Sequence, residues 1–476
     1  MSEFVKSVNV IGLHGQFDFF CNFQEGVNVI YGKNGTGKTT LLHIIANVLN
    51  RDFTRFAALE FKQIKVEFSK GESLTIELER ISKPNLIDRI SRPNHYHYYI
   101  LVNGRRMNEK EICPLNLDKY LNRGIGRISR EEEDDASYLN FPNISLSSAY
   151  FPAFRTAIDA WAINHINQDE NSKVRRHPNI EKTVFARSLF GQFVPRLDYP
   201  ATTEIEQDLN EKIRTAIAKV SQADRTYFNN VQSKILEALS SNEHSQGNTN
   251  SIFQDIEELS KKFQEYPIQV ESISANLSES IQSVPDNEDS KRIVSLVLNA
   301  YKEALNEIVI VQESSFAEVE RYLKSVNIFL ENKNLKISQI DSSPRGQFSK
   351  RTRSPSIVVQ FEGENARPMS MSQSLSSGER QIVTLIYATT RMSQQDVVLV
   401  DEPEISLNVD WQRKLLPEMV RQMPSKQLIV CTHSPLVGAK YRDRMIELKS
   451  SQTSQFNVSQ IELLDDLEDL YIDIED

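Results

Sequence analysis

The chain of 476 residues contains no run of about 20 consecutive apolar residues, the length that a membrane-spanning helix requires. Its first residues, Met1 to Lys6, lack the basic and then apolar pattern of a signal peptide. Cysteine occurs only three times, and no two cysteines form the CxxC pair that binds zinc or carries out redox chemistry. These absences exclude a membrane-embedded role and a disulfide scaffold, and they predict a protein of the reducing cytoplasm.

Positive charge is also in short supply. Lysine and arginine number 55 against 65 aspartates and glutamates, for a net charge of −10. This balance argues against a protein that coats nucleic acid through bulk charge, although a local basic groove stays open. Hydrophobic residues make up 39% and charged residues 25%, which is typical of a globular chain. Since one domain commonly holds about 100–200 residues, the length predicts two or three compact units.

The first part of the chain predicts strands around one helix. Aromatic and β-branched residues indicate short strands at 17–23 and 27–31, and leucine and isoleucine recur at helical spacing over 41–49. Alternation over 64–80 predicts an antiparallel hairpin, and residues 96–102 predict a further strand that ends at an Asn-Gly turn. We therefore predict an antiparallel lobe in this region.

The middle of the chain is helical by pattern. Apolar residues recur mostly at steps of three and four in stripes over 205–239, 252–281 and 293–330. These stripes predict an α-helical hairpin or bundle inserted at 157–335, and the pattern does not separate an extended arm from an ordinary bundle.

Beyond residue 343 the pattern returns to short apolar runs that alternate with helical segments, with strands predicted at 356–361, 397–400 and 427–430. This alternation is typical of a mostly parallel sheet covered by helices on both faces. We therefore predict an α/β head whose two parts, 1–156 and 336–476, flank the helical insertion.

A phosphate-binding pattern lies between the strand at 27–31 and the helix that follows it. Residues 32–39 match G-x-x-x-x-G-K-[ST] in full, and we call them the phosphate loop. Glycines let successive N–H groups point at phosphate oxygens, and the following helix adds its positive end. In this pattern Lys38 reaches the β- and γ-phosphates of a nucleotide, and the Thr39 hydroxyl is a Mg²⁺ ligand. The predicted phosphate-binding residues are Gly32, Lys33, Asn34, Gly35, Thr36, Gly37, Lys38, Thr39 and Thr40. The alternative is a glycine-rich turn that merely precedes a helix.

Two carboxylates follow the apolar strand at 397–400. Ligands of open α/β sheets bind at the carboxyl ends of the strands, where Asp401 and Glu402 are expected. We predict that Asp401 holds Mg²⁺ through water and that Glu402 orients or deprotonates an attacking water. The alternative is that Asp401 starts a turn and Glu402 is exposed beside Pro403.

A serine–glycine corner, which comprises Ser376, Ser377 and Gly378, stands just before the strand at 397–400. A helix that starts with these residues presents N–H groups and a positive dipole, which suit a γ-phosphate. Ser376 and Glu379 also have capping-box spacing, so the alternative is an ordinary helix start.

His433 follows the strand predicted at 427–430. From this position it is expected to contact the γ-phosphate and polarise the attacking water. The alternative is a surface or core histidine whose hydrogen bonds are satisfied.

In this order and spacing, the four elements resemble the head of ABC-type ATPases. Within that superfamily the chain is similar to the branch that contains the OLD-type nucleases, the RecF and SMC-like proteins, and ATPase subunits of bacterial anti-phage systems. Residues 402–412 resemble the acidic-strand and D-loop motif of this branch, with Asn408 where a histidine is common. Residues 150–155 resemble a segment of the same branch near the Q-loop.

The resemblance implies an ABC-type head, with a mostly parallel sheet and an antiparallel N-terminal lobe, and it implies ATP and Mg²⁺ as cofactors. It further implies a head-to-tail dimer or higher homo-oligomer. In such a dimer the phosphate loop, Asp401, Glu402 and His433 of one copy face the serine–glycine corner of the other across each ATP. Binding joins the heads, hydrolysis releases them, and the helical insertion transmits the change.

Two hypotheses for the use of ATP follow from the resemblance. Only 43 residues follow His433, too few for the nuclease domain of OLD-type enzymes, and the insertion has no cysteine for a zinc hook. The first hypothesis is an ATPase subunit of an anti-phage defence complex similar to PARIS or Septu. Such a subunit forms oligomers, holds a separate nuclease effector and controls it when infection is sensed, with a phage-encoded trigger as a further partner. The acidic tail at 462–476 could dock a basic effector surface or simply be solvated.

The second hypothesis is a DNA-binding repair or maintenance ATPase of the RecF type. Two basic clusters support it, and they could line a DNA groove or lie in solvated loops. The clusters consist of Lys173, Arg175 and Arg176, and of Arg345, Lys350, Arg351 and Arg353.

Overall fold

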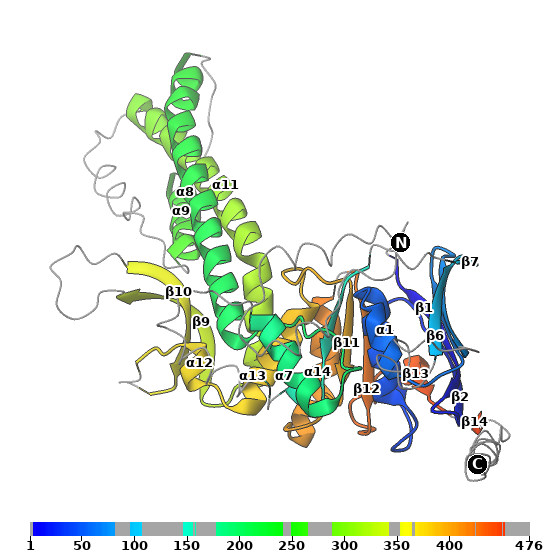
Figure 1. Ribbon diagram of the computed structural model, residues 1–476. Coiled ribbons are helices and arrows are strands. Elements are labelled where there is room, and N and C mark those ends of the chain that lie inside the picture. The colour runs from blue at the N-terminus through cyan, green and yellow to red at the C-terminus, as the bar shows by residue number, and fades with distance from the viewer. Residues whose placement is uncertain are drawn as a thin grey trace, which may run out of the picture. The chain divides into compact units, whose positions relative to one another are not determined.

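The computed structural model describes residues 3–80, 96–106, 146–155, 158, 178–240, 249–264, 288–341, 353–363, 367–423, 425–449 and 451–452. Its contacts divide the chain into two compact units (Figure 1). Unit 1 comprises Met1–Tyr199 and Ser393–Asp476, and unit 2 comprises Pro200–Met392.

Unit 1 holds two sheets and the helices around them. Its strands are β1 (Val5–Leu13), β2 (Phe17–Asn22), β3 (Val27–Tyr31), β4 (Gln63–Phe68), β5 (Ser73–Arg80), β6 (Tyr96–Val102), β7 (Arg105–Arg106), β8 (Ser148–Phe151), β11 (Val397–Asp401), β12 (Gln427–Thr432), β13 (Met445–Glu447) and β14 (Ser451–Gln452). Its helices are α1 (Lys38–Leu49), α7 (Pro178–Phe190) and α14 (Val409–Gln422), with short 3₁₀ turns at η1 (Phe53–Ala58) and η3 (Arg442–Arg444).

A five-stranded parallel sheet with the order β13-β3-β12-β11-β8 forms the core of unit 1. Every residue of β11 and β12 is buried, as expected for central strands of Val, Ile and Leu that are covered on both faces. Helix α1 packs against β8, β11 and β12 (Figure 1). Because the strands are parallel, the carboxyl ends of β3, β11 and β12 meet at one edge of the sheet.

The second sheet of unit 1 is antiparallel, with the order β14-β2-β1-β4-β5-β6-β7. The predicted hairpin is confirmed as β4 and β5, which pair from Gln63 opposite Glu77 to Glu67 opposite Ser73. Strand β1 was not predicted from the sequence, although it is central, between β2 and β4. Its pairing shifts register near both ends, and such irregularities break the strict alternation by which a strand is recognised.

Unit 2 is built around long helices. Its elements are α8 (Thr202–Ser240), α9 (Thr249–Gln264), α11 (Glu288–Asn327), α12 (Met371–Ser374), α13 (Ser377–Thr389) and the strands β9 (Lys333–Asp341) and β10 (Arg353–Phe361). Strands β9 and β10 pair as an antiparallel hairpin. Helices α8 and α11 lie side by side, and α9 packs on α11 (Figure 1). The three helical stripes are therefore confirmed where the structure describes them; residues 265–287, which include part of the second stripe, lie outside the described residues.

The ends of α8 and α11 show that these helices run antiparallel. Asp208, near the start of α8, accepts a hydrogen bond of 2.5 Å from Tyr387 of α13, and the Tyr322 hydroxyl of α11 donates to the carbonyl of Val383 in the same helix α13 at 2.9 Å. At the other end, Lys234 of α8 pairs with Glu303 of α11 at 2.9 Å. Helix α13 thus packs at the base of the helix pair, within the same unit.

The division by contacts runs differently from the predicted one. The sequence predicted residues 336–476 as one part of the head, whereas residues 336–392 group with the long helices in unit 2. The physical reason is the packing of β10, α12 and α13 against α8, together with the packing of α13 against α11.

These features confirm the predicted α/β class with a parallel sheet, an antiparallel N-terminal sheet and long helices in the segment between the two parts of unit 1. Within the described residues, no helix combines the length and the apolar content that a membrane span needs.

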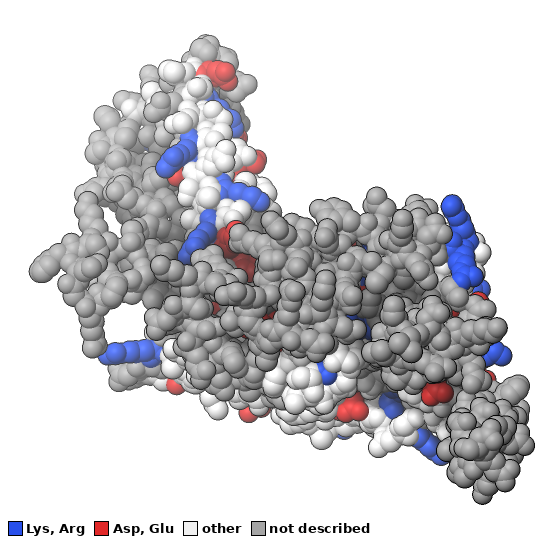
Figure 2. Space-filling model, viewed as in Figure 1, with Lys and Arg blue, Asp and Glu red and all other residues white. Residues whose placement is uncertain are grey.

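Charges on the long helices of unit 2 are mixed in sign. Helix α8 carries both basic and acidic residues, and Figure 2 shows no continuous field of one sign on this face of it. Several of these charges form pairs, including Lys302 with Asp255 at 2.5 Å and Lys261 with Glu257 at 3.0 Å. Of the two predicted basic clusters, only Arg353 lies within the described residues, at the start of β10, and the acidic tail at 462–476 lies outside them.

Candidate active site

The phosphate loop connects β3 to α1 at the edge of the parallel sheet. Gly35 and Gly37 adopt φ angles of 78° and 90°, in the left-handed region that residues with a side chain rarely enter. The Thr36 hydroxyl donates to the carbonyl of Lys33 at 3.0 Å, which closes the turn from within. Helix α1 starts after Gly37 without a side-chain cap and without an acidic residue in its first turn. Its N-terminal N–H groups and its positive dipole end are therefore available to an anion.

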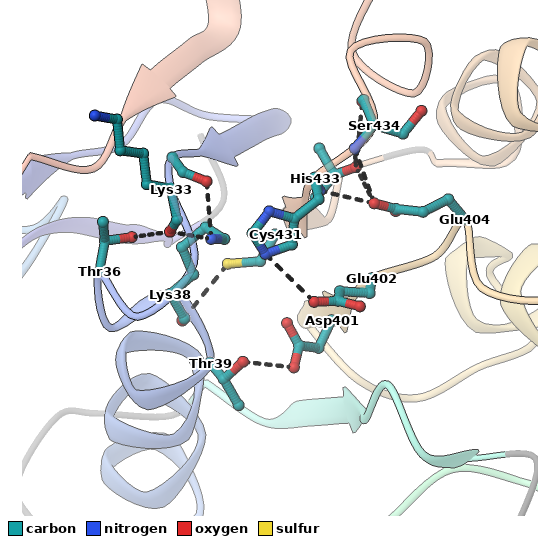
Figure 3. Close-up of polar contacts among 12 residues, drawn as sticks. Lys33, Thr36, Lys38, Thr39, Asp401, Glu402, Glu404, Cys431, His433 and Ser434 are labelled. Carbon is teal, nitrogen blue, oxygen red and sulfur yellow. Dashed lines mark hydrogen bonds and ion pairs between the residues drawn. The ribbon is translucent and has the colours of Figure 1, made fainter.

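Lys38 lies folded over the loop. Its Nζ donates to the carbonyl oxygens of Gly32 and Lys33, each at 3.0 Å, and its side chain is buried (Figure 3). Burial lowers the pKa of this ammonium, and the nearby carboxylates Asp401 and Glu402 oppose that effect. The ammonium group of Lys38 thus lies at the loop where a phosphate would bind. Its bonds to the two carbonyls can be exchanged for bonds to phosphate oxygens.

Asp401 is the last residue of β11 and lies beside Thr39 in the first turn of α1. The Thr39 hydroxyl donates to its Oδ2 at 2.9 Å, and the residue is buried. Burial raises the pKa of Asp401 to about 6, against the lowering effect of the Thr39 hydrogen bond. The carboxylate of Asp401 and the hydroxyl of Thr39 are both oxygen ligands of the kind that divalent cations bind.

The predicted Mg²⁺ fits this pair. Mg²⁺ prefers oxygen ligands and is commonly bound by one or two carboxylates together with substrate phosphates rather than by an all-protein cage. In the part of the chain that the structure describes, no three His, Cys, Asp or Glu side chains gather as a ligand set. Thr39 and Asp401, the two predicted Mg²⁺ ligands, lie in contact and would hold the ion.

Glu402 and His433 extend from the ends of neighbouring strands toward one another. His433 Nε2 lies 3.5 Å from Glu402 Oε1, and both side chains are about one-third exposed (Figure 3). Glu402 has a φ of 45°, a left-handed conformation that is uncommon for a residue with a side chain, and its N–H donates to the carbonyl of Cys431 at 2.8 Å. The backbone of β11 thus turns sharply at Glu402, and this turn aims its side chain at His433.

A cavity of about 650 Å³ joins these groups. Its lining combines the phosphate loop, the start of α1, Glu402 and His433 with the turn between β1 and β2. The lining residues are Leu13, His14, Phe17, Asn34, Gly35, Gly37, Lys38, Thr39, Thr40, Glu402 and His433. The sequence did not predict the contribution of Leu13, His14 and Phe17, because nothing in their local pattern connects them to the loop.

Arg155 contacts the backbone at the end of β11. Its guanidinium is buried and donates to the backbone carbonyls of Asp401 at 3.1 Å, Glu402 at 3.3 Å and Pro403 at 3.4 Å. A further bond to the carbonyl of Pro152 at 2.9 Å anchors the same group to the end of β8, the neighbour of β11. The sequence placed Arg155 only within a family-like segment. Its contacts join positions 246 to 248 residues apart, which no local signal reports.

The serine–glycine corner lies in unit 2, at the start of α13. Ser376 caps the helix, since its Oγ accepts from the N–H of Glu379 at 3.4 Å and its own N–H donates to Glu379 Oε2 at 2.7 Å. The capping box expected from the spacing is thus confirmed. Ser376 and Ser377 are exposed, and Gly378 is buried.

Asn408, which stands where the resembled branch often has a histidine, is the N-cap of α14. Its Oδ1 accepts from the N–H of Trp411 at 2.8 Å. This position therefore starts the helix that follows the acidic strand, a task for which asparagine is well suited.

Two parts of the chain match models of ATPase families. Residues 202–438 match the family model described as "AAA domain, putative AbiEii toxin, Type IV TA system", and residues 28–87 match that of the "ATPase family associated with various cellular activities (AAA)". The second match contains the phosphate loop, and the first contains the serine–glycine corner, Asp401, Glu402 and His433. Both models describe ATPase domains, and together the two matches contain all four predicted elements of the site. Among proteins of curated function, none matches the chain.

Three solved structures of SMC heads are similar at low levels. The Smc head of Pyrococcus furiosus with an extended coiled coil, bound to the C-terminal domain of ScpA, is 14% identical, with 98% of this chain and 100% of that chain covered and a TM-score of 0.37. An SMC head bound to the C-winged helix domain of ScpA is 11% identical, with 94% and 97% covered and a TM-score of 0.38. The Smc head of Pyrococcus yayanosii with a coiled coil and joint is 15% identical, with 98% and 100% covered and a TM-score of 0.33. TM-scores below 0.5 do not establish a common fold. The fold is therefore defined only by the sheets and helices of this chain.

Proposed function

We propose that this chain binds ATP with Mg²⁺ and hydrolyses it. The observation that carries the proposal is the convergence, around one cavity of unit 1, of an uncapped helix start with its lysine and of a carboxylate–imidazole pair 3.5 Å apart. The first part suits the phosphates of a nucleotide, and the second suits the activation of a water molecule. The matches to AAA-type ATPase families support the same chemistry.

The residues have separate tasks in this scheme. The N–H groups of the phosphate loop and Lys38 bind the β- and γ-phosphates, for which Lys38 exchanges its bonds to the loop carbonyls. Thr39 and Asp401 would hold Mg²⁺, which would supply positive charge to neutralise the phosphate oxygens. Glu402 orients the attacking water and accepts its proton, and His433 donates to a γ-phosphate oxygen. Arg155 keeps the backbone of Asp401 and Glu402 in place for these tasks.

At the level of the whole protein, we propose the ATPase subunit of a cytoplasmic anti-phage defence complex. In it, 1–156 and 336–476 act as the head and 157–335 as its helical insertion. The serine–glycine corner of a second copy completes each ATP site in a head-to-tail dimer or higher oligomer, and a separate nuclease is the controlled effector. The family description over residues 202–438, which names a putative AbiEii toxin and a Type IV TA system, supports a role of this kind.

A Glu402→Gln variant tests the ATPase proposal. The amide keeps the shape of the side chain but cannot accept a proton, so we expect ATP binding to persist while turnover falls by roughly 10²- to 10⁴-fold. Binding is measured by titration calorimetry with ATP and Mg²⁺, and turnover by phosphate release. Glu447→Gln, at an exposed carboxylate of β13, is the matched control. Turnover that survives in Glu402→Gln would remove Glu402 from its role.

A second experiment tests the partner. We expect the tagged chain, expressed with its neighbouring genes, to co-purify with the product of the gene immediately downstream, and that product to have nuclease activity. DNA binding by the purified chain alone that falls steeply with salt, without any co-purified protein, would favour the RecF-like alternative instead.

A further inference from the structure

One carboxylate oxygen organises the turn that carries His433. Oε1 of Glu404 accepts hydrogen bonds from the Thr432 hydroxyl at 2.8 Å, from the N–H of His433 at 2.7 Å and from the N–H of Ser434 at 2.9 Å (Figure 3). The donors are three consecutive residues at the end of β12. Glu404 therefore binds the backbone on both sides of the His433 side chain.

The sheet explains why this carboxylate reaches the turn. Strands β11 and β12 are parallel neighbours, with Asp401 opposite Cys431, so the loops that follow them leave the sheet at the same edge. Glu402 lies in the first loop, His433 lies in the second, and Glu404 spans from the first to the second. Glu404 thus connects the loop of Glu402 to the loop of His433, and the side chains of Glu402 and His433 lie 3.5 Å apart.

The hydrogen bonds between Glu404 and the turn are accepted by a charged group. Hydrogen bonds to a carboxylate are charge-assisted and exceed neutral ones in strength, and here three of them share one oxygen. The other oxygen, Oε2, is buried and accepts no hydrogen bond from the described residues. Among the described residues, the carboxylate of Glu404 therefore binds the turn through Oε1 alone.

The turn has a second support that does not touch His433. The Ser434 hydroxyl donates to Gln412 Oε1 of α14 at 2.8 Å, and Gln412 Nε2 donates to the carbonyl of Leu407 at 3.0 Å. Removing Gln412 weakens the turn but leaves the bond from Glu404 to the His433 backbone. Gln412 is therefore a matched control for general loosening of the loop.

We infer that Glu404 is a positioning residue, which holds the His433 imidazole at the distance from Glu402 that hydrolysis requires. The inference rests on the proposed ATPase function. It differs from a purely structural role in one respect: the loss of Glu404 should matter only while His433 is present.

A double-mutant cycle of Glu404→Ala and His433→Ala tests this dependence. We expect Glu404→Ala to lower kcat by roughly 10- to 100-fold, since small misplacements at a reacting centre have effects of this size. Binding of a non-hydrolysable ATP analogue should stay within about 2-fold of the unmodified chain, and in the His433→Ala background Glu404→Ala should change kcat by less than about 2-fold. Glu404→Gln should restore most of kcat, because its amide oxygen can accept the same bonds. Gln412→Ala should lower kcat less than Glu404→Ala does.

The outcomes separate the inference from its premise. If the unmodified chain hydrolyses ATP and the two effects on kcat multiply, the positioning role is overturned while the ATPase proposal stands. If the unmodified chain does not hydrolyse ATP, both are overturned. If Glu404→Ala does not fold, as judged by thermal melting, Glu404→Asp takes its place: it keeps the charge but draws the carboxylate back by one bond, about 1.5 Å. A Glu404→Asp variant with full kcat would also overturn the role.

Discussion

Two helix starts in this molecule carry glycine and small polar residues, and they are built differently. Helix α1 of unit 1 follows Gly37, which has a φ of 90° and no side chain to cap the helix, and its first turn holds no acidic residue. Helix α13 of unit 2 follows Ser376, which forms a reciprocal capping box with Glu379. The first helix start leaves its N–H groups open, whereas the second satisfies part of them internally.

We propose that this difference separates a helix start that binds a phosphate strongly from one that contacts it only weakly. The N-terminus of a helix carries about half a positive charge. The first turn of α1 itself contains no acidic residue, although the carboxylate of Asp401 accepts a hydrogen bond from Thr39 in that turn, and Lys38 adds a positive charge. At α13 Glu379 compensates it, and this glutamate is paired in turn with Lys333 at 2.8 Å. We therefore expect α1 to supply most of the electrostatic attraction for a nucleotide, and the exposed serines of the α13 corner to supply a weaker contact in the proposed dimer.

Of the changes at the two helix starts, Lys38→Ala should have the largest effect on nucleotide binding. A hydrogen bond to a charged group is worth about 1.5–3 kcal/mol, so Lys38→Ala should weaken ATP binding by roughly 10- to 150-fold. Titration calorimetry with ATP and Mg²⁺ measures the loss. Lys33→Ala, at an exposed lysine of the same loop, is the control and should have a smaller effect. Undiminished affinity in Lys38→Ala would show that the open helix start is not the phosphate site.

Acid should affect the two helices in different pH ranges. His43 lies on the buried face of α1 with its Nε2 2.8 Å from the Tyr150 hydroxyl, and burial lowers its pKa from 6.5 to about 3. Burial raises the pKa of Glu379 in α13, but its hydrogen bonds from Lys333 and Ser376 outweigh this, so its pKa falls below the ordinary 4.5.

The signs of the two contributions follow. Below pH 6.5 His43 is protonated in the unfolded chain but not in the folded chain. The free energy of unfolding therefore decreases as the pH is lowered, by up to about 1.4 kcal/mol per pH unit. The contribution of Glu379 is complete above pH 4.5 and is lost as pH falls through its lowered folded pKa. Of these two contributions, only that of His43 changes between pH 6.5 and 4.5. Asp401, whose folded pKa is raised to about 6, titrates in the same range with the opposite sign, and its contribution is common to the chains compared below.

Chemical denaturation across this pH range compares the unmodified chain with His43→Gln. The variant cannot titrate at this position, so its stability should fall less steeply below pH 6.5. His14→Gln, at an exposed histidine, is the control and should keep the steeper slope. Equal slopes for His43→Gln and the unmodified chain would contradict the expected role of His43.

The parts of this comparison that the sequence could predict are the local ones. Aromatic and β-branched residues predicted β3, the glycine pattern predicted the loop, and leucine and isoleucine at helical spacing predicted α1, because each of these signals depends on neighbouring residues alone. The spacing of Ser376 and Glu379 predicted the capping box for the same reason, and the apolar run before Asp401 predicted β11. Each of these signals lies within a dozen residues.

The parts that could not be predicted depend on packing between distant segments. Arg155 meets the end of β11 only because β8 and β11 are neighbours in the sheet. Glu404 meets the turn at His433 only because β11 and β12 are neighbours. The association of α13 with the long helices depends in the same way on contacts such as that between Tyr322 and Val383. The serine–glycine corner was therefore predicted as a motif, whereas the unit to which it belongs was not.

The smallest expected effect concerns the capped helix itself. Ser376→Ala removes the oxygen that accepts from the N–H of Glu379, and the loss of such a cap typically costs about 1 kcal/mol. Ser376→Asp should retain the cap but place a negative charge at the corner that is proposed to meet a γ-phosphate. Both variants should therefore keep ATP binding by the monomer, since the corner lies outside the phosphate loop. Ser376→Asp should impair nucleotide-dependent dimerisation, measured by light scattering with ATP and Mg²⁺, more than the less stable Ser376→Ala does. The opposite order would mean that the corner acts through the stability of α13 and not through contact with a phosphate, and the two helix starts would then have no shared ligand.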